Sequence, residues 1–130
     1  MNIEQDLRLA LNVRENAKPG TCNYSVGSVL KTKNGKRYTG CNIDNDAIQS
    51  MCAERVAFAK AISEGESEFE YILVVGGPKG GNIEKCLPCG YCRQFMNQYV
   101  GDDFKVYTYY DEKVEEYTMK DLLPHSFKLK

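Results

Sequence analysis

The order of predicted elements in this 130-residue chain indicates an α/β fold of three layers, α-β-α, with helices on both faces of a mixed five-stranded sheet. Two observations carry this prediction. Early in the chain, two apolar segments flank an Asn-Gly pair, which is typical of an antiparallel hairpin. Later, strand-like and helical segments alternate, and this alternation favours parallel pairing. No repeat or linker divides the sequence, so residues 1–130 are expected to form a single domain.

The first half of the chain provides the opening helix and the hairpin. Apolar residues at helical spacing predict an amphipathic helix over residues 2–17, which Pro19 helps to end. Strands are expected over residues 24–31 and 36–43. The Asn-Gly pair between them predicts a turn of two residues.

In the second half, two core helices alternate with strands. Helix formers with few polar residues predict a helix buried on most sides over residues 52–63. The helix over residues 89–100 is expected to turn its apolar residues, including Tyr99, toward the core. The unbroken apolar run at 71–75 is typical of a central buried strand. The remaining expected elements are strands over 104–110 and 113–117 and a short helix over 119–123.

The composition argues against several classes of protein. Seventeen Lys and Arg face eighteen Asp and Glu, and no basic stripe is present to bind a nucleic-acid backbone. Residues 1–17 contain no apolar run fit for a signal peptide, and no segment approaches the roughly 18 apolar residues of a membrane span. We therefore expect a cytoplasmic protein with no nucleic-acid or membrane partner.

The six cysteines and the single histidine limit the kinds of metal site that the chain can form. Without a secretion signal, this many cysteines favours metal binding and buried thiols over disulfides. The segment at 88–92, Pro-Cys-Gly-Tyr-Cys, places Cys89 and Cys92 three residues apart at a predicted helix start. Cys52 is the best candidate for a third ligand, because Glu54 follows it two residues later. Three thiolates leave one tetrahedral position on a zinc ion open, as in catalytic zinc sites.

Charged residues beside these cysteines suit hydrolytic chemistry. Glu54, next to a zinc-bound water, can take a proton from that water and pass it on. Three thiolates and a hydroxide leave the site negatively charged. Arg55 and Arg93 follow Glu54 and Cys92 directly and are placed to compensate this charge. The combination favours hydrolytic attack on an electron-poor carbon that bears an amine.

Two segments, Cys-Ala-Glu-Arg at 52–55 and Pro-Cys-Gly-Tyr-Cys-Arg-Gln at 88–94, together resemble the zinc-dependent cytidine deaminases of the small type with three cysteine ligands. Further blocks follow in the family's order: Val26-Gly27, Gly40-Cys41-Asn42, Ser63-Glu64-Gly65, and Leu122-Leu123-Pro124 with Phe127. The resemblance covers nearly the whole chain. It implies the cytidine deaminase-like fold, one Zn²⁺ per subunit, and a homotetramer with shared active sites.

The resemblance also implies the reaction and the residues that carry it. Cys52, Cys89 and Cys92 would bind zinc, and zinc-bound hydroxide would attack C4 of the base with Glu54 as the proton shuttle. Cytidine and 2′-deoxycytidine would become uridine and 2′-deoxyuridine with release of ammonia, in pyrimidine salvage. The chain would thus be a hydrolase acting on C–N bonds of a small nucleoside.

Five residues would bind the substrate if the resemblance holds. The backbone N–H of Ala53 would hold the base O2, Asn42 and Asp44 the ribose hydroxyls, and Tyr24 would lie against the base. Phe127 would reach the site of a neighbouring subunit. Asp44 stands where the family usually has glutamate, and Tyr24 where it has phenylalanine. These departures leave open a modified cytosine nucleoside such as blasticidin S, whose deaminases share the zinc chemistry.

Two other functions stay open. In a non-catalytic structural zinc domain, a fourth protein ligand would occupy the last coordination position of the metal. Cys86 is the candidate for that ligand. Cys86 also begins a C-x2-C-x2-C run with Cys89 and Cys92, but the fourth cysteine that iron–sulfur proteins need is missing. We expect Cys86 to be a loop thiol without a role. Deamination of a base inside nucleic acid is disfavoured by the near-neutral charge.

Overall fold

The computed structural model describes residues 2–127 and contains a five-stranded sheet with strand order β2-β1-β3-β4-β5. The β3–β4 pair is parallel, and the other three pairs are antiparallel. The elements are α1 (Ile3–Arg14), η1 (Gly20–Cys22), β1 (Tyr24–Thr32), β2 (Arg37–Cys41), α2 (Ala53–Ser63), β3 (Phe69–Pro78), α3 (Gly90–Asn97), β4 (Lys105–Tyr110), β5 (Lys113–Thr118) and α4 (Met119–Leu122). The predicted mixed sheet is therefore confirmed.

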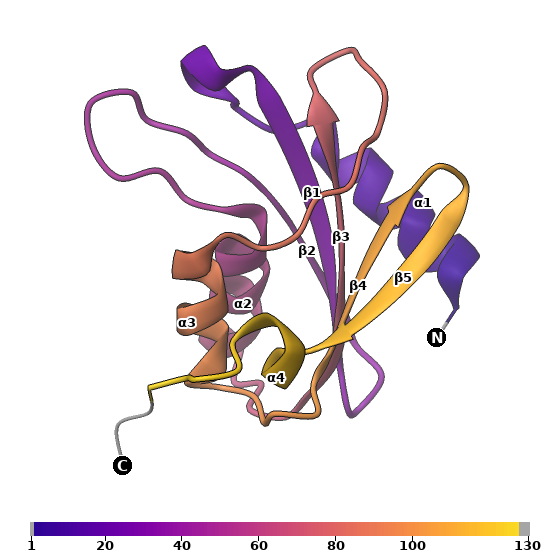
Figure 1. Ribbon diagram of the computed structural model, residues 1–130, viewed down its shortest axis with the longest axis vertical. Coiled ribbons are helices and arrows are strands. Elements are labelled where there is room, and N and C mark those ends of the chain that lie inside the picture. The colour runs from indigo at the N-terminus through magenta and orange to yellow at the C-terminus, as the bar shows by residue number, and fades with distance from the viewer. Residues whose placement is uncertain (1, 128–130) are drawn as a thin grey trace.

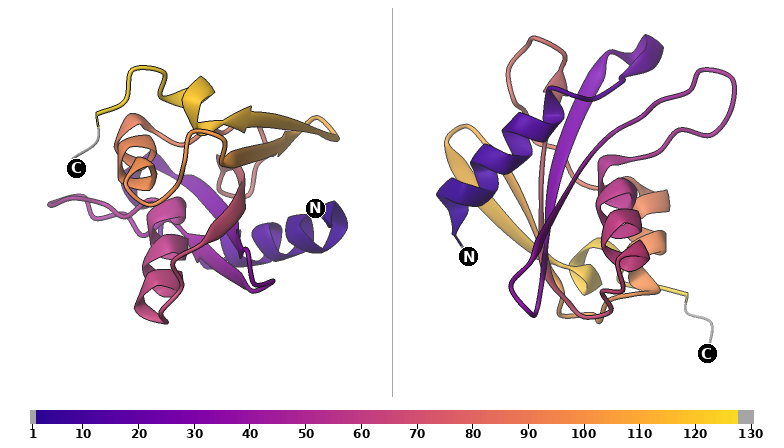
Figure 2. Two further views of the ribbon diagram at one scale, coloured as in Figure 1. Left: turned by 90° about the horizontal axis from the view of Figure 1, so that it is seen from below. Right: turned by 180° about the vertical axis from the view of Figure 1, so that it is seen from behind.

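Helices cover both faces of the sheet, as predicted. Helix α1 lies on one face, and α2 and α3 lie side by side on the other (Figures 1 and 2). The larger core fills the space under α2 and α3 and is centred on the fully buried Phe58. The smaller core lies under α1. Residues 72–75 of β3 are fully buried because both cores cover this central strand.

The β1–β2 hairpin forms as expected, but its turn is longer than predicted. The backbone N–H of Thr32 donates to Lys36 O, and the N–H of Gly35 donates to Thr32 O. Three residues, ending in Gly35 with a φ of 93°, therefore make the turn. A tight turn followed by one left-handed residue is a common three-residue hairpin loop, and glycine adopts that conformation without a Cβ penalty.

The predicted helices are correct in place but differ in length and burial. Helix α2 exposes Ala59 and Lys60, so it is buried on one side and not on most sides. Tyr99, which follows the end of α3, is 44% exposed, and the prediction that it faces the core is wrong. The N–H of Tyr99 donates to Met96 O, which tightens the backbone after Asn97. This tightening turns Tyr99 away from the core that Met96 enters.

The first turn of α2 lies unusually close to the β1–β2 hairpin. A Cβ atom on Gly40 would lie 2.3 Å from Ala53 O and 2.6 Å from Ala57 N, so only glycine fits there. Ser28, which pairs with Gly40 across the strands, donates its hydroxyl to Ala53 O at 3.0 Å. The sheet thus fixes the position at which α2 begins.

We expect Gly40→Ala to destabilise the protein by about 3 kcal/mol, because the added methyl group overlaps backbone atoms that cannot move without shifting α2. Urea unfolding followed by circular dichroism measures this change. Gly90→Ala is the control, since a Cβ at Gly90 meets no atom within 4 Å. Equal stability of the two variants would contradict close packing at Gly40.

Candidate active site

Three cysteine sulfurs converge where α2 and α3 begin. Cys52 is the N-cap of α2, Cys89 is the N-cap of α3, and Cys92 lies in the first turn of α3. Their Sγ atoms all lie within 4.8 Å of one another, and those of Cys52 and Cys89 are 3.7 Å apart. With Zn–S bonds of about 2.3 Å, tetrahedral geometry separates two sulfurs by about 3.8 Å. The triad therefore has the spacing needed to hold one zinc ion.

Because the sulfurs of the triad lie close together, the pKa values of Cys52 and Cys92 are shifted. A hydrogen bond with Cys92 lowers the pKa of Cys52 to about 6, and the nearby charge of Arg55 contributes to the same shift. The same hydrogen bond, together with burial, raises the pKa of Cys92. Cys52 is also at a helix N-terminus, where a negative charge is favoured. Of Cys52 and Cys92, Cys52 is therefore the one whose thiol loses its proton more easily.

Only one of the two arginines expected to compensate this charge lies beside the sulfurs. Arg55 interacts with Cys52, and its guanidinium stacks on the ring of Tyr91 at 4.4 Å. Arg93 instead donates to Pro88 O at 2.7 Å and to Leu122 O at 2.8 Å. Arg93 therefore ties the start of α3 to α4, and the expectation that it serves the metal charge is not supported by these contacts.

Glu54 lies next to the triad in the first turn of α2 and is only 3% exposed. Burial raises the pKa of its carboxyl group to about 7, and the negative charge of Cys52 adds to this shift. A carboxyl group with a pKa near neutrality exchanges protons readily in both directions. Its position beside the sulfurs suits proton transfer at a metal-activated group.

A small pocket of about 210 Å³ opens beside the sulfurs. Every residue predicted for the site lines it except Cys92 and Phe127. Cys92 is fully buried within α3, behind the pocket. The long loop between β2 and α2 (Figure 1) provides Asp44 and Ser50 to the rim. The structure therefore brings Cys52, Cys89, Glu54 and most of the predicted substrate contacts into one cavity, with the Cys92 sulfur close to those of Cys52 and Cys89.

Asn42 holds the loop start against β1. Its side-chain oxygen accepts from the N–H of Val26 at 2.8 Å, and its amide nitrogen donates to Tyr24 O at 2.8 Å and to Asp44 Oδ1 at 3.2 Å. Both amide hydrogens are thus engaged. An incoming hydroxyl group must share Asn42 or displace Asp44 from it.

Phe127 lies apart from this chain's pocket. Its carbonyl oxygen accepts from Gln94 Nε2 at 2.7 Å and from Asn97 Nδ2 at 3.3 Å, so the C-terminal segment runs along α3 (Figure 1). Its ring is 66% exposed. The side chain is therefore directed outward instead of into the site of its own chain.

Cys86 lines the pocket, although it was expected to be a loop thiol without a role. It is not part of the metal-binding group, which among residues 2–127 contains only Cys52, Cys89 and Cys92. The sequence did hold a signal for this position. Cys86 precedes Cys89 by three residues, so the segment that delivers Cys89 to the metal must carry Cys86 past the same cavity.

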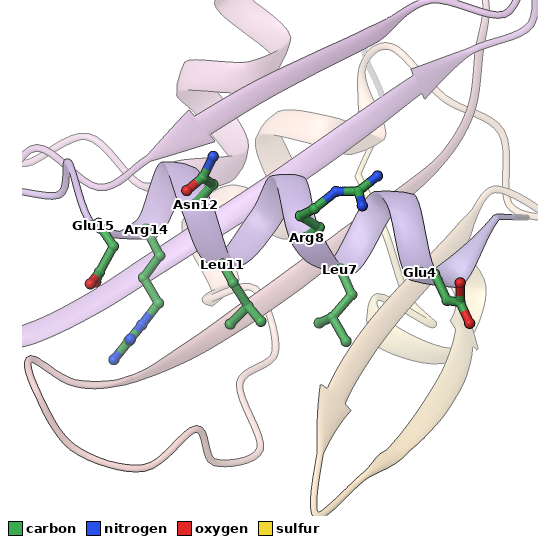
Figure 3. A pocket seen from close by; sticks show the side chains of 7 residues that line it. All are labelled: Glu4, Leu7, Arg8, Leu11, Asn12, Arg14 and Glu15. Carbon is green, nitrogen blue, oxygen red and sulfur yellow. The ribbon is translucent and has the colours of Figure 1, made fainter.

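A larger hollow, of about 590 Å³, lies along α1 and away from the cysteines (Figure 3). All of its lining residues belong to the α1 segment, with Leu7 and Leu11 projecting from one side of the helix. It brings together no metal-binding group, and it is a surface depression over the small core. The pocket at the start of α2 is therefore the candidate active site.

A family model matches this chain. The model of the cytidine and deoxycytidylate deaminase zinc-binding region matches residues 1–108. The chain belongs to the cytidine and deoxycytidylate deaminase family. This family assignment confirms the resemblance predicted from the two cysteine segments, and it agrees with a cysteine triad that can hold one zinc ion.

Individual relatives match from about three quarters to nearly all of this deaminase. A cytidine deaminase from Sporosarcina psychrophila is 36% identical over 129 residues, which cover 98% of this chain and 92% of the relative. A blasticidin-S deaminase from Bacillus cereus is 28% identical over 106 residues, covering 78% and 75%. The crystal structure of a cytidine deaminase from Burkholderia pseudomallei superposes with a TM-score of 0.84 at 33% identity, covering 98% and 100%. The cytidine deaminase-like fold is thereby confirmed.

Within residues 2–127, no helix combines the length and the apolar character needed to cross a bilayer.

We expect Cys89→Ala to lose stoichiometric zinc and to unfold at a lower temperature, because metal binding contributes to the stability of the folded state. Elemental analysis and thermal denaturation measure both effects. Cys86→Ala is the matched control and should keep its zinc, since Cys86 lies outside the triad. Zinc retained in Cys89→Ala, or lost in Cys86→Ala, would reassign the ligands.

Proposed function

We propose that this chain is a zinc-dependent cytidine deaminase, a hydrolase that converts cytidine and 2′-deoxycytidine to uridine and 2′-deoxyuridine with release of ammonia. Residues 1–130 act as one catalytic domain in this proposal. The observation that carries it is the convergence of the cysteine triad with buried Glu54 at one pocket. The 36% identical relative named cytidine deaminase supports the choice of substrate.

In this proposal, the pocket residues each act on a defined part of the substrate. A zinc ion on Cys52, Cys89 and Cys92 would supply an activated water next to the base. As the oxygen of that water bonds to C4, Glu54 would take its two protons in turn, passing the first to N3 of the base and the second to the amine, which leaves as ammonia when the C4–N bond breaks. The N–H of Ala53 has no intrahelical partner in the first turn of α2 and is available to the base O2.

The sugar end of the pocket is formed by the loop after β2. Asn42 and Asp44 line the pocket there and offer hydrogen bonds to ribose hydroxyl groups. Once a sugar hydroxyl shares Asn42 or displaces Asp44 from it, both residues would serve ribose and deoxyribose, which differ only at the 2′ position. Blasticidin S is the second candidate substrate, because a blasticidin-S deaminase also matches this chain. The higher identity to the cytidine deaminase favours the ordinary nucleosides.

We propose further that the protein is a homotetramer with shared active sites. One chain provides a pocket of about 210 Å³, which is below the roughly 300 to 1,000 Å³ of typical ligand sites. Phe127 and Tyr91 expose large apolar side chains near α3 and offer contact area for another subunit. A neighbour's Phe127 would complete the pocket. Cytoplasmic pyrimidine salvage is the expected setting, supported by the small nucleoside substrate.

Glu54→Gln should keep its fold and zinc but lose about 10³-fold in kcat, since the amide cannot carry protons. An absorbance assay of cytidine turnover, together with zinc analysis, tests this. Glu64→Gln, at the exposed opposite end of α2, is the control and should keep normal activity. Activity in Glu54→Gln within tenfold of the wild type would remove Glu54 from the mechanism.

Phe127→Ala should raise the KM for cytidine about tenfold while changing kcat little, because the ring acts in substrate binding at a neighbouring site. Steady-state kinetics measure this. Analytical ultracentrifugation of the wild type should give about four times the 14.7 kDa mass of one chain. A monomer with full activity would contradict both the shared site and the tetramer.

A further inference from the structure

Two segments that are distant in the sequence are joined at the sugar end of the candidate active site. Residues 18–21 lead into η1, and residues 42–46 begin the loop between β2 and α2. The N–H of Lys18 donates to Asn42 O at 3.0 Å, and the N–H of Asp44 donates to Lys18 O at 2.8 Å. These backbone hydrogen bonds attach the part of the loop that carries both expected sugar contacts.

A side-chain contact fastens the same loop two residues further on. Asp46 Oδ1 accepts from the backbone N–H of Thr21 at 3.2 Å and from the Thr21 hydroxyl group at 3.1 Å. We call these two hydrogen bonds the Thr21–Asp46 clasp. Neither residue lines the pocket. Asp44 is thus held by its own backbone N–H and, two residues later, by the clasp.

Gly20 allows the two segments to come this close. Its φ of 61° lies in the left-handed region, which glycine adopts without a Cβ penalty. A Cβ atom on Gly20 would lie 2.8 Å from Asp46 Oδ1 and 3.2 Å from Asp44 Cβ. The backbone of Gly20 therefore lies close to both aspartate side chains, and a shift of Asp46 away from Thr21 alters the surroundings of Asp44.

Asp44 depends on these contacts more than Asn42 does. Asn42 directly follows β2 and is bonded to β1 through Val26 and Tyr24, whereas Asp44 lies in the loop beyond the sheet. Asn42 Nδ2 donates to Asp44 Oδ1 at 3.2 Å, and both side chains line the pocket. One sugar hydroxyl group can contact both residues because their polar atoms are this close. Contacts with residues 18–21 keep Asp44 at that place.

We propose that Asp46 is a positioning residue: through its clasp with Thr21 it holds Asp44 where the carboxylate binds a sugar hydroxyl group, and it thereby raises the affinity for nucleosides that carry such groups. This inference rests on the proposed deaminase function and adds Asp46 and Thr21 to the residues that serve sugar binding. Asp46 is not part of the metal-binding group found among residues 2–127, so its effect is on binding and not on proton transfer.

The first test compares Asp46→Ala with Asp46→Asn in the zinc-loaded protein. Alanine removes the acceptor of both hydrogen bonds, whereas asparagine keeps an acceptor oxygen and removes the charge. Asp46→Ala should raise the KM for cytidine and the dissociation constant of the product uridine about threefold, a modest loss because water can replace exposed hydrogen bonds. Asp46→Asn should bind like the wild type. In both variants kcat should stay within about twofold, as expected when only binding changes.

A second ligand and a second position show whether the effect passes through Asp44. 2′,3′-Dideoxyuridine lacks the hydroxyl groups that Asp44 would bind, so Asp46→Ala should leave its dissociation constant unchanged. Asp44→Ala should itself weaken uridine binding, and adding Asp46→Ala to it should cause no further loss, because the residue that Asp46 positions is gone. Calorimetry measures these constants without turnover. Asp102→Ala removes an exposed carboxylate from the loop before β4 and is the control, with normal uridine binding expected.

The possible failures of this test are distinct. Unchanged uridine affinity in Asp46→Ala, an equal loss for dideoxyuridine, or a further loss in the double variant would overturn the positioning role. If Asp44→Ala binds uridine as tightly as the wild type, Asp44 is not a sugar contact and the inference falls with it. A zinc-loaded wild type that binds uridine but does not deaminate cytidine would instead overturn the proposed function.

Discussion

The contact between the first turn of α2 and the β1–β2 hairpin is the constraint on which the candidate site depends. Gly40 allows the helix backbone to approach, and the Ser28 hydroxyl binds the carbonyl group of Ala53. Cys52 precedes Ala53 and Glu54 follows it, so one fixed peptide unit sets the positions of both a metal-binding sulfur and the buried carboxyl group. The sheet therefore determines the geometry of residues that it does not contain.

The second half of the site is held by different means. Helix α3 begins at the end of a segment without regular structure, and Arg93 secures it by donating to carbonyl groups on both sides. The pocket thus has a rigid side, formed by α2 on the sheet, and a side formed by segments 42–52 and 79–89. Glu54 lies on the rigid side, where small displacements matter most, whereas Cys52 and Cys89 lie at the ends of the two segments. The two positions at which this chain departs from the family resemblance are Tyr24, at the start of β1, and Asp44, in segment 42–52, and both line the pocket.

Periodicity and turn residues were sufficient to predict the layers of the fold, and the cysteine segments with Glu54 indicated the metal site. The other pocket residues, Tyr24, Asn42, Asp44 and Ala53, were expected only from the resemblance to the family. The sequence was not sufficient where a tertiary contact decides the exposure or the partners of a side chain. The exposure of Tyr99 follows from tightening of the backbone after Asn97, which periodicity does not report. Arg93 and Arg55 occupy equivalent places beside a site residue, yet only packing reveals that one holds α4 and the other lies near Cys52. The position of Cys86 at the pocket, by contrast, follows from its spacing of three residues before Cys89.

The separation of Cys52 and Cys89 along the chain has a consequence for folding. The two sulfurs are 37 residues apart, and α2 and β3 lie between them. An ion bound to both sulfurs closes a long loop that contains α2 and β3. A metal held by the triad would thus act as a cross-link that opposes separation of the two helices.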